Sequence, residues 1–212
     1  MSPRAYRLGR RAEAIDATRR AIVDAAREIL IKGGYPELSI DAVAAQAGVV
    51  RATVYYQFRS KVGLLEAVAT DAERRAGIGR FDRIAEATSA AETVRRVSRE
   101  HARFWAAEEP VFRTLIGLAR IDPDIGEVVW RHDQGRREDI RQVVERLRGE
   151  GVLGPGWTVS LATEVLWLVT GFDAFDHLHS RSGLSVAMTG DALAGLASVV
   201  LKDRLDKGSA KR

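Results

Sequence analysis

Side chains that can hydrogen-bond to nucleic acid follow a single glycine near the amino end of the chain. Arg51, Thr53, Tyr56 and Gln57 lie in the segment GVVRATVYYQF, which begins at Gly48. An arginine carries a fork of donors that fits a guanine edge, and hydroxyl and amide groups reach base edges or phosphates. These residue types at this spacing favour contact with DNA.

Two short helices joined by the glycine turn are predicted to position these side chains. Ser39 is suited to cap the first helix, residues 40–47 repeat apolar side chains at helical spacing, and Gly48 suits the left-handed residue that ends it. Lys61 opens a further helix, where its ammonium can meet a phosphate oxygen. This order predicts a helix-turn-helix whose second helix enters the major groove. The alternative is a three-helix packing unit whose aromatic residues are only core.

A supporting helix is predicted over residues 18–33, ending at the Gly33-Gly34 pair. The stretches RRAIVDAAREILIKGGY, SIDAVAAQAGVVRATVYYQF and SKVGLL follow one another in this region. On these stretches, residues 18–65 resemble the DNA-binding domain of the TetR family of transcriptional regulators. The resemblance covers about a quarter of the chain.

The resemblance implies a set of DNA contacts. Arg51 and Ala52 stand where family members touch bases, and Lys61 stands where they bind phosphate. The sequence departs from the family pattern at Val50, which replaces a serine that caps the recognition helix, and at Gln57, which replaces a histidine. The predicted DNA-binding residues are Ser39, Arg51, Ala52, Thr53, Tyr55, Tyr56, Gln57 and Lys61.

The positive charge of the chain is concentrated in the same region. The net charge is +4 over 212 residues, and residues 1–61 carry 11 Lys and Arg against 6 Asp and Glu. The polar stretch SPRAYRLGRR at the amino end is either an arm that follows DNA or a solvated tail. The chain has no cysteine and no apolar run that could span a bilayer, so we expect a cytoplasmic protein with no cofactor, no metal and no membrane contact.

The rest of the chain predicts an all-α fold of about nine helices. We expect four segments: a basic flexible arm (1–17), the helix-turn-helix domain (18–62), a ligand-binding and dimerisation domain (63–206) and a polar tail (207–212). Helices beyond the DNA-binding domain are predicted over 61–76, 91–107, 110–120, 123–149, 157–179 and 187–205.

The helix predicted over 157–179 is apolar on nearly every side, so we expect a second subunit to cover part of it. The resemblance implies a homodimer made by packing two C-terminal helices of each subunit into a four-helix bundle. Two recognition helices would then lie roughly 34–36 Å apart on a near-palindromic operator. The predicted interface residues are Leu168, Phe172, Phe175, Leu193, Leu196 and Val200.

Aromatic residues are spread over several helices of the same region. They either fill an ordinary core or converge around a cavity for an apolar or aromatic ligand. The resemblance favours the cavity, because family members sense small molecules in this domain. The predicted ligand-binding residues are His101, Phe104, Trp105, Phe112, Trp130 and Trp167.

A catalytic or metal site has one candidate. Asp173 and His177 are spaced to share a helix face, but no matching pair occurs elsewhere. An ion pair with an arginine, or a hydrogen bond to an effector, explains these groups and the isolated Glu164 at less chemical cost. We therefore expect no enzyme but a dimeric DNA-binding regulator, most simply a ligand-controlled repressor. The alternative function is a helical ligand carrier or bundle enzyme in which residues 39–61 are only scaffold.

Overall fold

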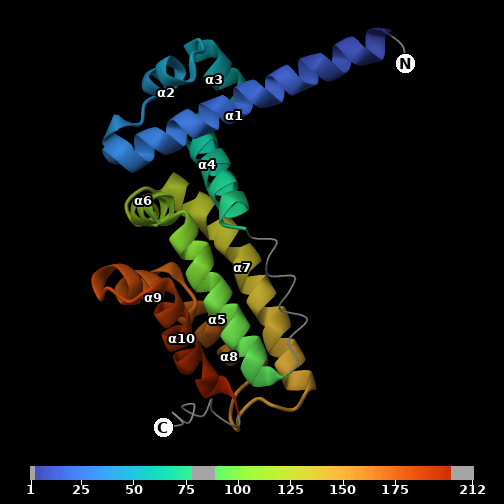
Figure 1. Cartoon of the computed structure of the whole chain (residues 1–212), viewed down its shortest axis with the longest axis vertical. Coiled ribbons are helices and arrows are strands. Elements are labelled where there is room, and N and C mark those ends of the chain that lie inside the picture. Colours follow the sequence, from blue (N-terminus) through green and yellow to red (C-terminus); the bar gives the residue numbers. More distant parts are fainter. Residues whose placement is uncertain (1–2, 78–88, 202–212) are drawn as a thin grey trace. The chain divides into compact units, whose positions relative to one another are not determined.

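The structure is a computed structural model that describes residues 3–77 and 89–201, with side chains from residue 13 onward. Among the described residues, the regular elements are all helices, and the extended pairing is limited to one isolated bridge between Leu153 and Leu201 (Figure 1). The all-α prediction is confirmed. The helices are α1 (Pro3–Glu37), α2 (Ile40–Ala47), α3 (Arg51–Phe58), α4 (Lys61–Ala76), α5 (Ala90–Ala107), α6 (Glu109–Ala119), α7 (Pro123–Gly149), α8 (Val159–Val169), α9 (Phe172–Asp176) and α10 (Val186–Ala197). Two short turns of other helix types, η2 (His177–Arg181) and η3 (Ser198–Val200), follow α9 and α10.

The chain forms two compact units, which are described separately. The first unit consists of the described parts of Met1–Ala72 and Pro110–Val129 and is called the reading unit. The second unit consists of the described parts of Glu73–Glu109 and Trp130–Arg212 and is called the bundle unit. The border predicted between residues 62 and 63 thus falls within α4 and inside the reading unit. Across the part of the chain that is described, no helix is both long and apolar enough to cross a bilayer.

In the reading unit, α1 supports α2 and α3, and its inner side buries Ile22, Ala26 and Leu30 (Figure 1). The predicted start of this helix at residue 18 is wrong, because the backbone is already helical from Pro3. A proline in the first turn suits a helix start, and the next proline, Pro36, lies in the last turn of α1. The predicted end is nearly right, since Gly34 has a non-helical backbone (φ 70°, ψ −169°).

The bundle unit is built around α5, which packs along α10, and α7, whose later turns bury Ile140, Val144 and Leu147 (Figure 1). The helix predicted over 157–179 is wrong as a single element, because α8 ends at Val169 and α9 begins at Phe172. The predicted helix over 187–205 ends early as well: α10 stops at Ala197, and the chain leaves η3 in an extended conformation. The remaining predicted residues, 202–205, lie outside the described part.

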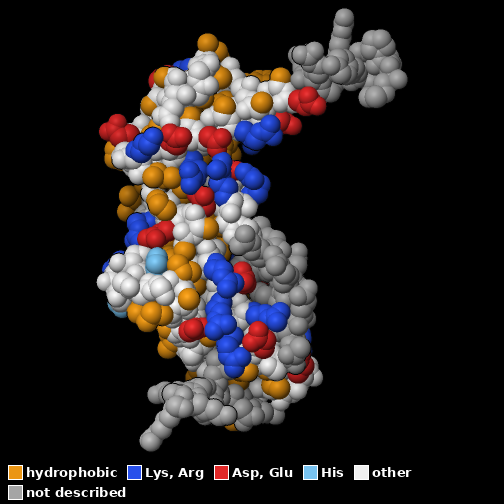
Figure 2. All heavy atoms as spheres, in the orientation of Figure 1, with side chains coloured by type: hydrophobic (Ala, Val, Ile, Leu, Met, Phe, Trp, Pro, Cys, Tyr) orange, Lys and Arg blue, Asp and Glu red, His pale blue; other side chains and the backbone are white. Residues whose placement is uncertain are grey.

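Basic side chains are numerous on the bundle unit, and Figure 2 shows them over the face that α5 presents, with acidic side chains among them. On α5, Arg95 and Arg96 both pair with Glu92, and Arg99 reaches Asp191 on α10 at 2.6 Å. The basic residues on this face are therefore balanced locally by carboxylates.

Candidate nucleic-acid interface and bundle core

The turn between α2 and α3 is built by the local signals predicted from the sequence. Ser39 caps α2, its hydroxyl accepting a hydrogen bond from the amide of Ala42 at 3.0 Å. Gly48 ends the helix in the left-handed region (φ 66°, ψ 32°), and the amide of Val49 donates to the carbonyl of Ala44 at 3.0 Å. Both predictions are confirmed, and together they fix where α3 begins.

The recognition helix α3 has one buried side and one exposed side. Val54 and Phe58 are buried, while Tyr56 is 77% exposed and Tyr55 is 41% exposed. No side chain caps the start of α3 at Val50, as expected from the missing serine. Of the other predicted DNA contacts on α3, Arg51 and Ala52 are exposed, and Thr53 and Gln57 are half-buried at its edge.

The turn from α3 to α4 depends on a close backbone approach. The hydroxyl of Ser60 accepts a hydrogen bond from the amide of Gly63 at 3.0 Å, and a Cβ on Gly63 would lie 2.2 Å from the carbonyl oxygen of Phe58. Arg59 adopts a positive φ of 67° in the same turn. This tight turn sets the first residue of α4, Lys61, directly after the recognition helix.

Lys61 is half-buried at the start of α4, and its Nζ lies 3.6 Å from the ring centroid of Tyr35. Burial lowers the pKa of Lys61, and the negative charge of Asp122 opposes that change. The ammonium is therefore held on an aromatic face beside the start of the helix.

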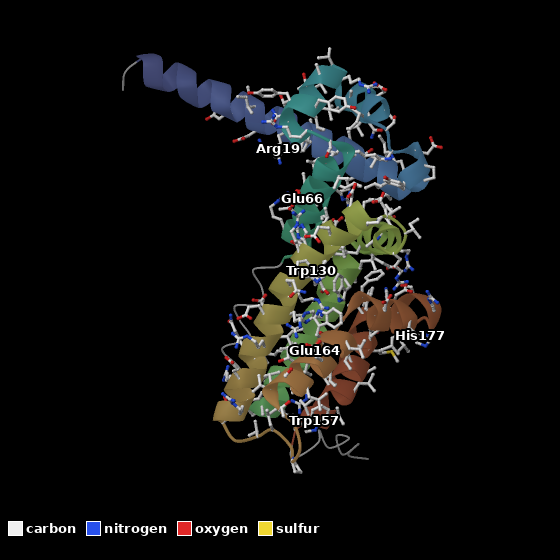
Figure 3. The ribbon with its side chains drawn as sticks, turned by 180° about the vertical axis from the view of Figure 1, so that it is seen from behind. Arg19, Glu66, Trp130, Trp157, Glu164 and His177 are labelled. Carbon is white, nitrogen blue, oxygen red and sulfur yellow. The ribbon has the colours of Figure 1, made fainter. Side chains whose placement is uncertain are left out.

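Arg19 on α1 holds the end of the helix α3 and was not among the residues predicted from the sequence. Its Nη1 donates to the carbonyl oxygen of Gln57 at 3.1 Å, and its guanidinium carbon lies 4.4 Å from the centre of the Phe58 ring. A cation at the carboxyl end of a helix complements the helix dipole and binds a carbonyl that has no partner within the helix. Arg19, labelled on α1 in Figure 3, thus ties the end of α3 to the supporting helix.

Arg51 is held in place by two neighbours on the surface of the unit. Its Nη1 donates to Oδ2 of Asp41 on α2 at 2.6 Å, and its Nη2 donates to the hydroxyl oxygen of Tyr55 at 3.2 Å. The hydrogen bond to Tyr55, followed by that to Asp41, raises the pKa of Arg51. The guanidinium is therefore charged and oriented before any ligand arrives.

In the bundle unit, a series of rings connects α5 to the residues after the break in α8. Trp105 lies edge-on to Phe104 on the same helix (4.9 Å between centroids) and to Phe172 on α9 (5.6 Å). Phe172 in turn contacts Phe175, at 6.0 Å. The Nε1 of Trp105 donates to the carbonyl oxygen of Thr170 at 2.9 Å, so the break between α8 and α9 turns a carbonyl towards this ring.

Arg136 on α7 is the central polar group of this core and was missed by the sequence reasoning. Its Nη1 donates to the carbonyl oxygen of Trp167 at 3.0 Å and to the hydroxyl of Thr170 at 3.3 Å, and its Nε pairs with Asp133. The guanidinium carbon lies 5.1 Å from the Trp167 ring centroid and 5.8 Å from that of Trp105. Burial lowers the pKa of Arg136, against the opposing effect of Asp133.

His101 on α5 is buried, with its Nδ1 2.8 Å from the carbonyl oxygen of Val97. Burial, followed by the positive charge of Arg136, lowers the pKa of His101 to about 3. The imidazole is therefore neutral near pH 7. Among the described residues, the buried polar atoms without a hydrogen-bond partner include Ser98 Oγ, Thr163 Oγ1 and Trp167 Nε1, on α5 and α8.

The structure separates the residues predicted to bind a ligand. His101, Phe104 and Trp105 are buried on one helix of the bundle unit, and Trp167 is partly buried on α8. Phe112 is buried but belongs to the reading unit, and Trp130 is 56% exposed on α7. The predicted set does not form one cluster within a unit, whereas Phe172 and Arg136 join Trp105 there.

A family comparison decides the identity of the helices around α3. The family described as bacterial regulatory proteins, tetR family, matches residues 22–68, from the supporting helix to the middle of α4. This part of the chain is therefore similar to the DNA-binding region of tetR-family regulators. Among its relatives, the uncharacterized HTH-type transcriptional regulator TtgW of Pseudomonas putida is 43% identical over 51 residues. That match spans 24% of this chain and 38% of TtgW, so it concerns the DNA-binding region alone.

Solved structures extend the likeness in fold to most of the chain. The structure of NalD, the secondary repressor of the MexAB-OprM multidrug efflux pump in Pseudomonas aeruginosa, superposes with a TM-score of 0.71 at 22% identity, covering 92% of this chain and all (100%) of NalD. The transcriptional regulator FadR of Bacillus subtilis, solved with stearoyl-CoA, gives a TM-score of 0.67 at 20% identity, covering 87% and 99%. At these identities the comparison establishes the fold. The relatives are described as transcriptional regulators, not enzymes.

The residues predicted for a dimer interface divide by burial. Phe175, Leu193 and Val200 are 0% exposed and Phe172 is 7% exposed, so these side chains fill the core of their own chain and cannot face a partner. Leu168 (65%) and Leu196 (57%) remain exposed, together with Leu161 and Met188. The assignment of the four buried residues is corrected because the bundle unit covers them itself.

The polar cluster near α9 forms no metal site. No group of three or more His, Cys, Asp or Glu residues able to hold a metal occurs in the described ranges. Asp176 pairs with Arg181 at 2.9 Å, and Ser180 donates to Glu109. Glu164 on α8, labelled in Figure 3, pairs with Arg137 on α7, as expected for an isolated carboxylate in an apolar helix.

Proposed function

We propose that this protein is a dimeric, sequence-specific DNA-binding repressor of the tetR family whose operator binding is controlled by a small molecule. The exposed outer side of α3, with Arg51, Tyr55 and Tyr56 between a capped turn and Lys61, is the observation that supports DNA binding most strongly. The side chains of this helix can reach base edges, while Lys61 and the start of α4 can bind phosphate. Such a protein acts where the chromosome lies, in the cytoplasm.

DNA binding is tested by selecting duplexes from a random pool with the full-length protein and measuring the selected duplex by gel shift. We expect a sequence-specific complex whose affinity falls steeply with salt. Lys61→Ala should weaken binding to all duplexes and reduce the salt slope by about 1, and Tyr56→Ala should weaken binding to the selected duplex. Arg146→Ala, which removes one positive charge from the bundle unit, is the matched control and should change neither value.

A wild-type protein that selects no sequence would contradict the proposal. Repression is read separately, from a reporter gene placed behind the selected operator. We expect stronger expression in cells that lack this chain than in cells that make it. Weaker expression in the cells that lack this chain would instead indicate that the protein is an activator.

The proposed dimer forms through the exposed apolar residues of α8 and α10. Leu161 and Leu168 lie two helical turns apart on α8, as Met188 and Leu196 do on α10, and α10 also packs against α8. Adjacent exposed leucines of this kind mark an interaction surface. The double variant Leu168→Glu/Leu196→Glu should be monomeric by light scattering, while Ile121→Glu, at another exposed apolar residue, should leave the dimer intact. A monomeric wild type would remove this part of the proposal.

The proposed effector is a small apolar or aromatic molecule bound in the bundle unit near Trp105 and Trp167. The indole N–H of Trp167 and the hydroxyls of Ser98 and Thr163 are buried without partners among the described residues, and a ligand with hydrogen-bond acceptors would satisfy the donors. FadR of Bacillus subtilis, which shares the fold, binds stearoyl-CoA in its solved structure.

An effector is identified by a thermal-shift screen of small aromatic and aliphatic compounds. A ligand present at about 100 times its dissociation constant should stabilise the protein by about 2.7 kcal/mol. The same ligand should change the affinity for the operator, because control requires different affinities for the two states. Trp167→Phe should weaken binding of the ligand and should not change the affinity for the operator when no ligand is present. An unchanged affinity for the ligand in this variant would place the site elsewhere.

A further inference from the structure

The contacts of Arg51 join two helices across the turn of the helix-turn-helix. Asp41 lies in the first turn of α2, whereas Arg51 and Tyr55 lie on successive turns of α3. The carboxylate binds Nη1, the phenol oxygen binds Nη2, and the guanidinium carbon lies 5.4 Å from the centre of the Tyr55 ring. The guanidinium is thus fixed by one group from the neighbouring helix and one from its own.

These contacts do little for the stability of the fold. The side chain of Arg51 is 56% exposed and that of Asp41 is 66% exposed. Ion pairs at such exposure are screened by solvent and contribute little to the free energy of unfolding. Their main physical effect is to restrict a long, flexible side chain to one conformation.

A fixed conformation matters because of the donors that remain. An arginine has donors on all three of its nitrogens, so Nη1 and Nη2 each keep a second N–H after binding Asp41 and Tyr55. An arginine with two adjacent N–H groups available can donate to the O6 and N7 acceptors of guanine in the major groove. Binding then costs less conformational entropy than it would for an unrestrained arginine.

The carboxylate of Asp41 also has an opposite effect. A negative charge beside the recognition helix repels phosphates and weakens binding to any DNA sequence. Asp41 is therefore costly for affinity and is useful only if orientation of Arg51 increases discrimination between sequences. A purely electrostatic role of Asp41 would change the affinity for all duplexes equally, whereas a positioning role would change the discrimination between them.

We propose that Asp41 and Tyr55 are positioning residues that hold Arg51 in the conformation that reads a guanine, and that they thereby set the specificity of the recognition helix. The inference rests on the proposed function, since it requires a DNA sequence that the protein selects. Asp41 acts on specificity through Arg51, not through a contact of its own with DNA.

The test measures the dissociation constants of the full-length protein for the selected operator and for an unrelated duplex at one salt concentration. Arg51→Ala should lower the ratio of specific to unrelated affinity by about 5- to 150-fold, the usual value of one bidentate contact. Asp41→Asn should raise affinity for the unrelated duplex yet lower the ratio by about 5-fold. Tyr55→Phe, which keeps the ring and removes the hydroxyl, should lower the ratio by about 2-fold.

Two controls separate positioning from charge. Glu37→Gln removes one negative charge from the same unit and should raise both affinities equally, with an unchanged ratio. In an Arg51→Ala background, Asp41→Asn should no longer affect the ratio, because the residue it positions is gone.

The outcomes separate failure of the proposed function from failure of the positioning role of Asp41 and Tyr55. If wild-type protein does not prefer any duplex, the proposed function fails. If wild-type protein selects an operator but Asp41→Asn leaves the ratio unchanged, the positioning role is overturned. If Asp41→Asn raises the ratio, Asp41 sequesters Arg51 from DNA instead of orienting it, which also overturns the inference.

Discussion

In the reading unit the polar side chains proposed to bind DNA lie on the surface, whereas in the bundle unit the polar side chains near the proposed effector lie inside. Arg51 and Tyr56 are exposed on α3, while His101 on α5 is buried and Arg136 on α7 is largely buried. An exposed polar group keeps its hydration until a ligand arrives, but a buried one needs partners within the fold. This difference supports the proposals that the reading unit binds DNA and that the bundle unit binds a small molecule.

The two units also differ in how far apart in sequence their partners lie. Ser39 caps an amide three residues away, and Gly48 acts through its own backbone. Trp105 and the carbonyl that it binds are 65 residues apart. The reading unit depends on tight local geometry, and the bundle unit on contacts between distant helices.

The largest expected effect tests the local geometry of the reading unit. In Gly63→Ala the new Cβ would meet the backbone oxygen of Phe58 at 2.2 Å, and a backbone atom cannot move aside cheaply. We expect a loss of about 3 kcal/mol in the free energy of unfolding, measured by denaturant titration with circular dichroism. Gly117→Ala, where nothing lies within 4 Å of the new Cβ, should be neutral or slightly stabilising. Equal losses in both variants would contradict a specific requirement at the α3–α4 turn.

The next effect tests the distant contacts of the bundle unit. Trp105→Phe removes the N–H that binds the carbonyl oxygen of Thr170 and leaves that buried oxygen with one partner fewer. We expect a loss of about 2 kcal/mol, read from guanidinium unfolding curves. Trp130→Phe, at a tryptophan that is 56% exposed, should change stability by less than about 0.5 kcal/mol. A similar loss at Trp130 would show that the comparison between buried and exposed tryptophans is mistaken.

The buried histidine makes the bundle unit sensitive to mild acid. His101 has a pKa of about 3 in the folded chain, and about 6.5 is expected once unfolding exposes it. Below pH 6.5 the unfolded chain therefore binds a proton that the folded chain does not, so stability is complete above that pH and falls by about 1.4 kcal/mol per pH unit below it.

This pH dependence is checked by denaturant titrations between pH 7.5 and about pH 5, above the range in which ordinary carboxylates titrate. His101→Gln should flatten the curve in this interval, whereas His177→Gln, at an exposed histidine, should keep the slope. An unchanged slope in His101→Gln would assign the acid sensitivity to another group.

The contrast between local and distant contacts also explains which parts of the fold and of the candidate site could be predicted from the sequence. The reading helices, the cap at Ser39, the left-handed Gly48 and the uncapped Val50 were predicted, because each depends on residues within a few positions of one another. Arg19 could not be assigned in this way, since its partner carbonyl is 38 residues away and its sequence neighbours do not reveal it.

In the bundle unit, apolar composition predicted helices but not their breaks or their buried faces. Gly171 was placed inside a long helix, although it lies just before α9, in a break where the carbonyl oxygen of Thr170 accepts a hydrogen bond from Trp105. Once the chain turns there, Phe172 and Phe175 enter the core instead of a dimer interface. A helix apolar on all sides does not show which side its own chain will cover, so only Leu168 and Leu196 of that set remained exposed.

The smallest predicted effects come from the two caps around the recognition helix. Ser39→Ala removes the hydrogen bond to the amide of Ala42 and should cost about 1 kcal/mol, measured by thermal unfolding. Val50→Ser should add the corresponding bond at the start of α3, where Val50 is 69% exposed and no side-chain cap exists, and stabilise the chain by about 0.5–1 kcal/mol. The double variant should lie near the wild type, because the caps serve different helices and their effects should add. Destabilisation by Val50→Ser would mean that the valine supplies packing which the open start of α3 does not suggest.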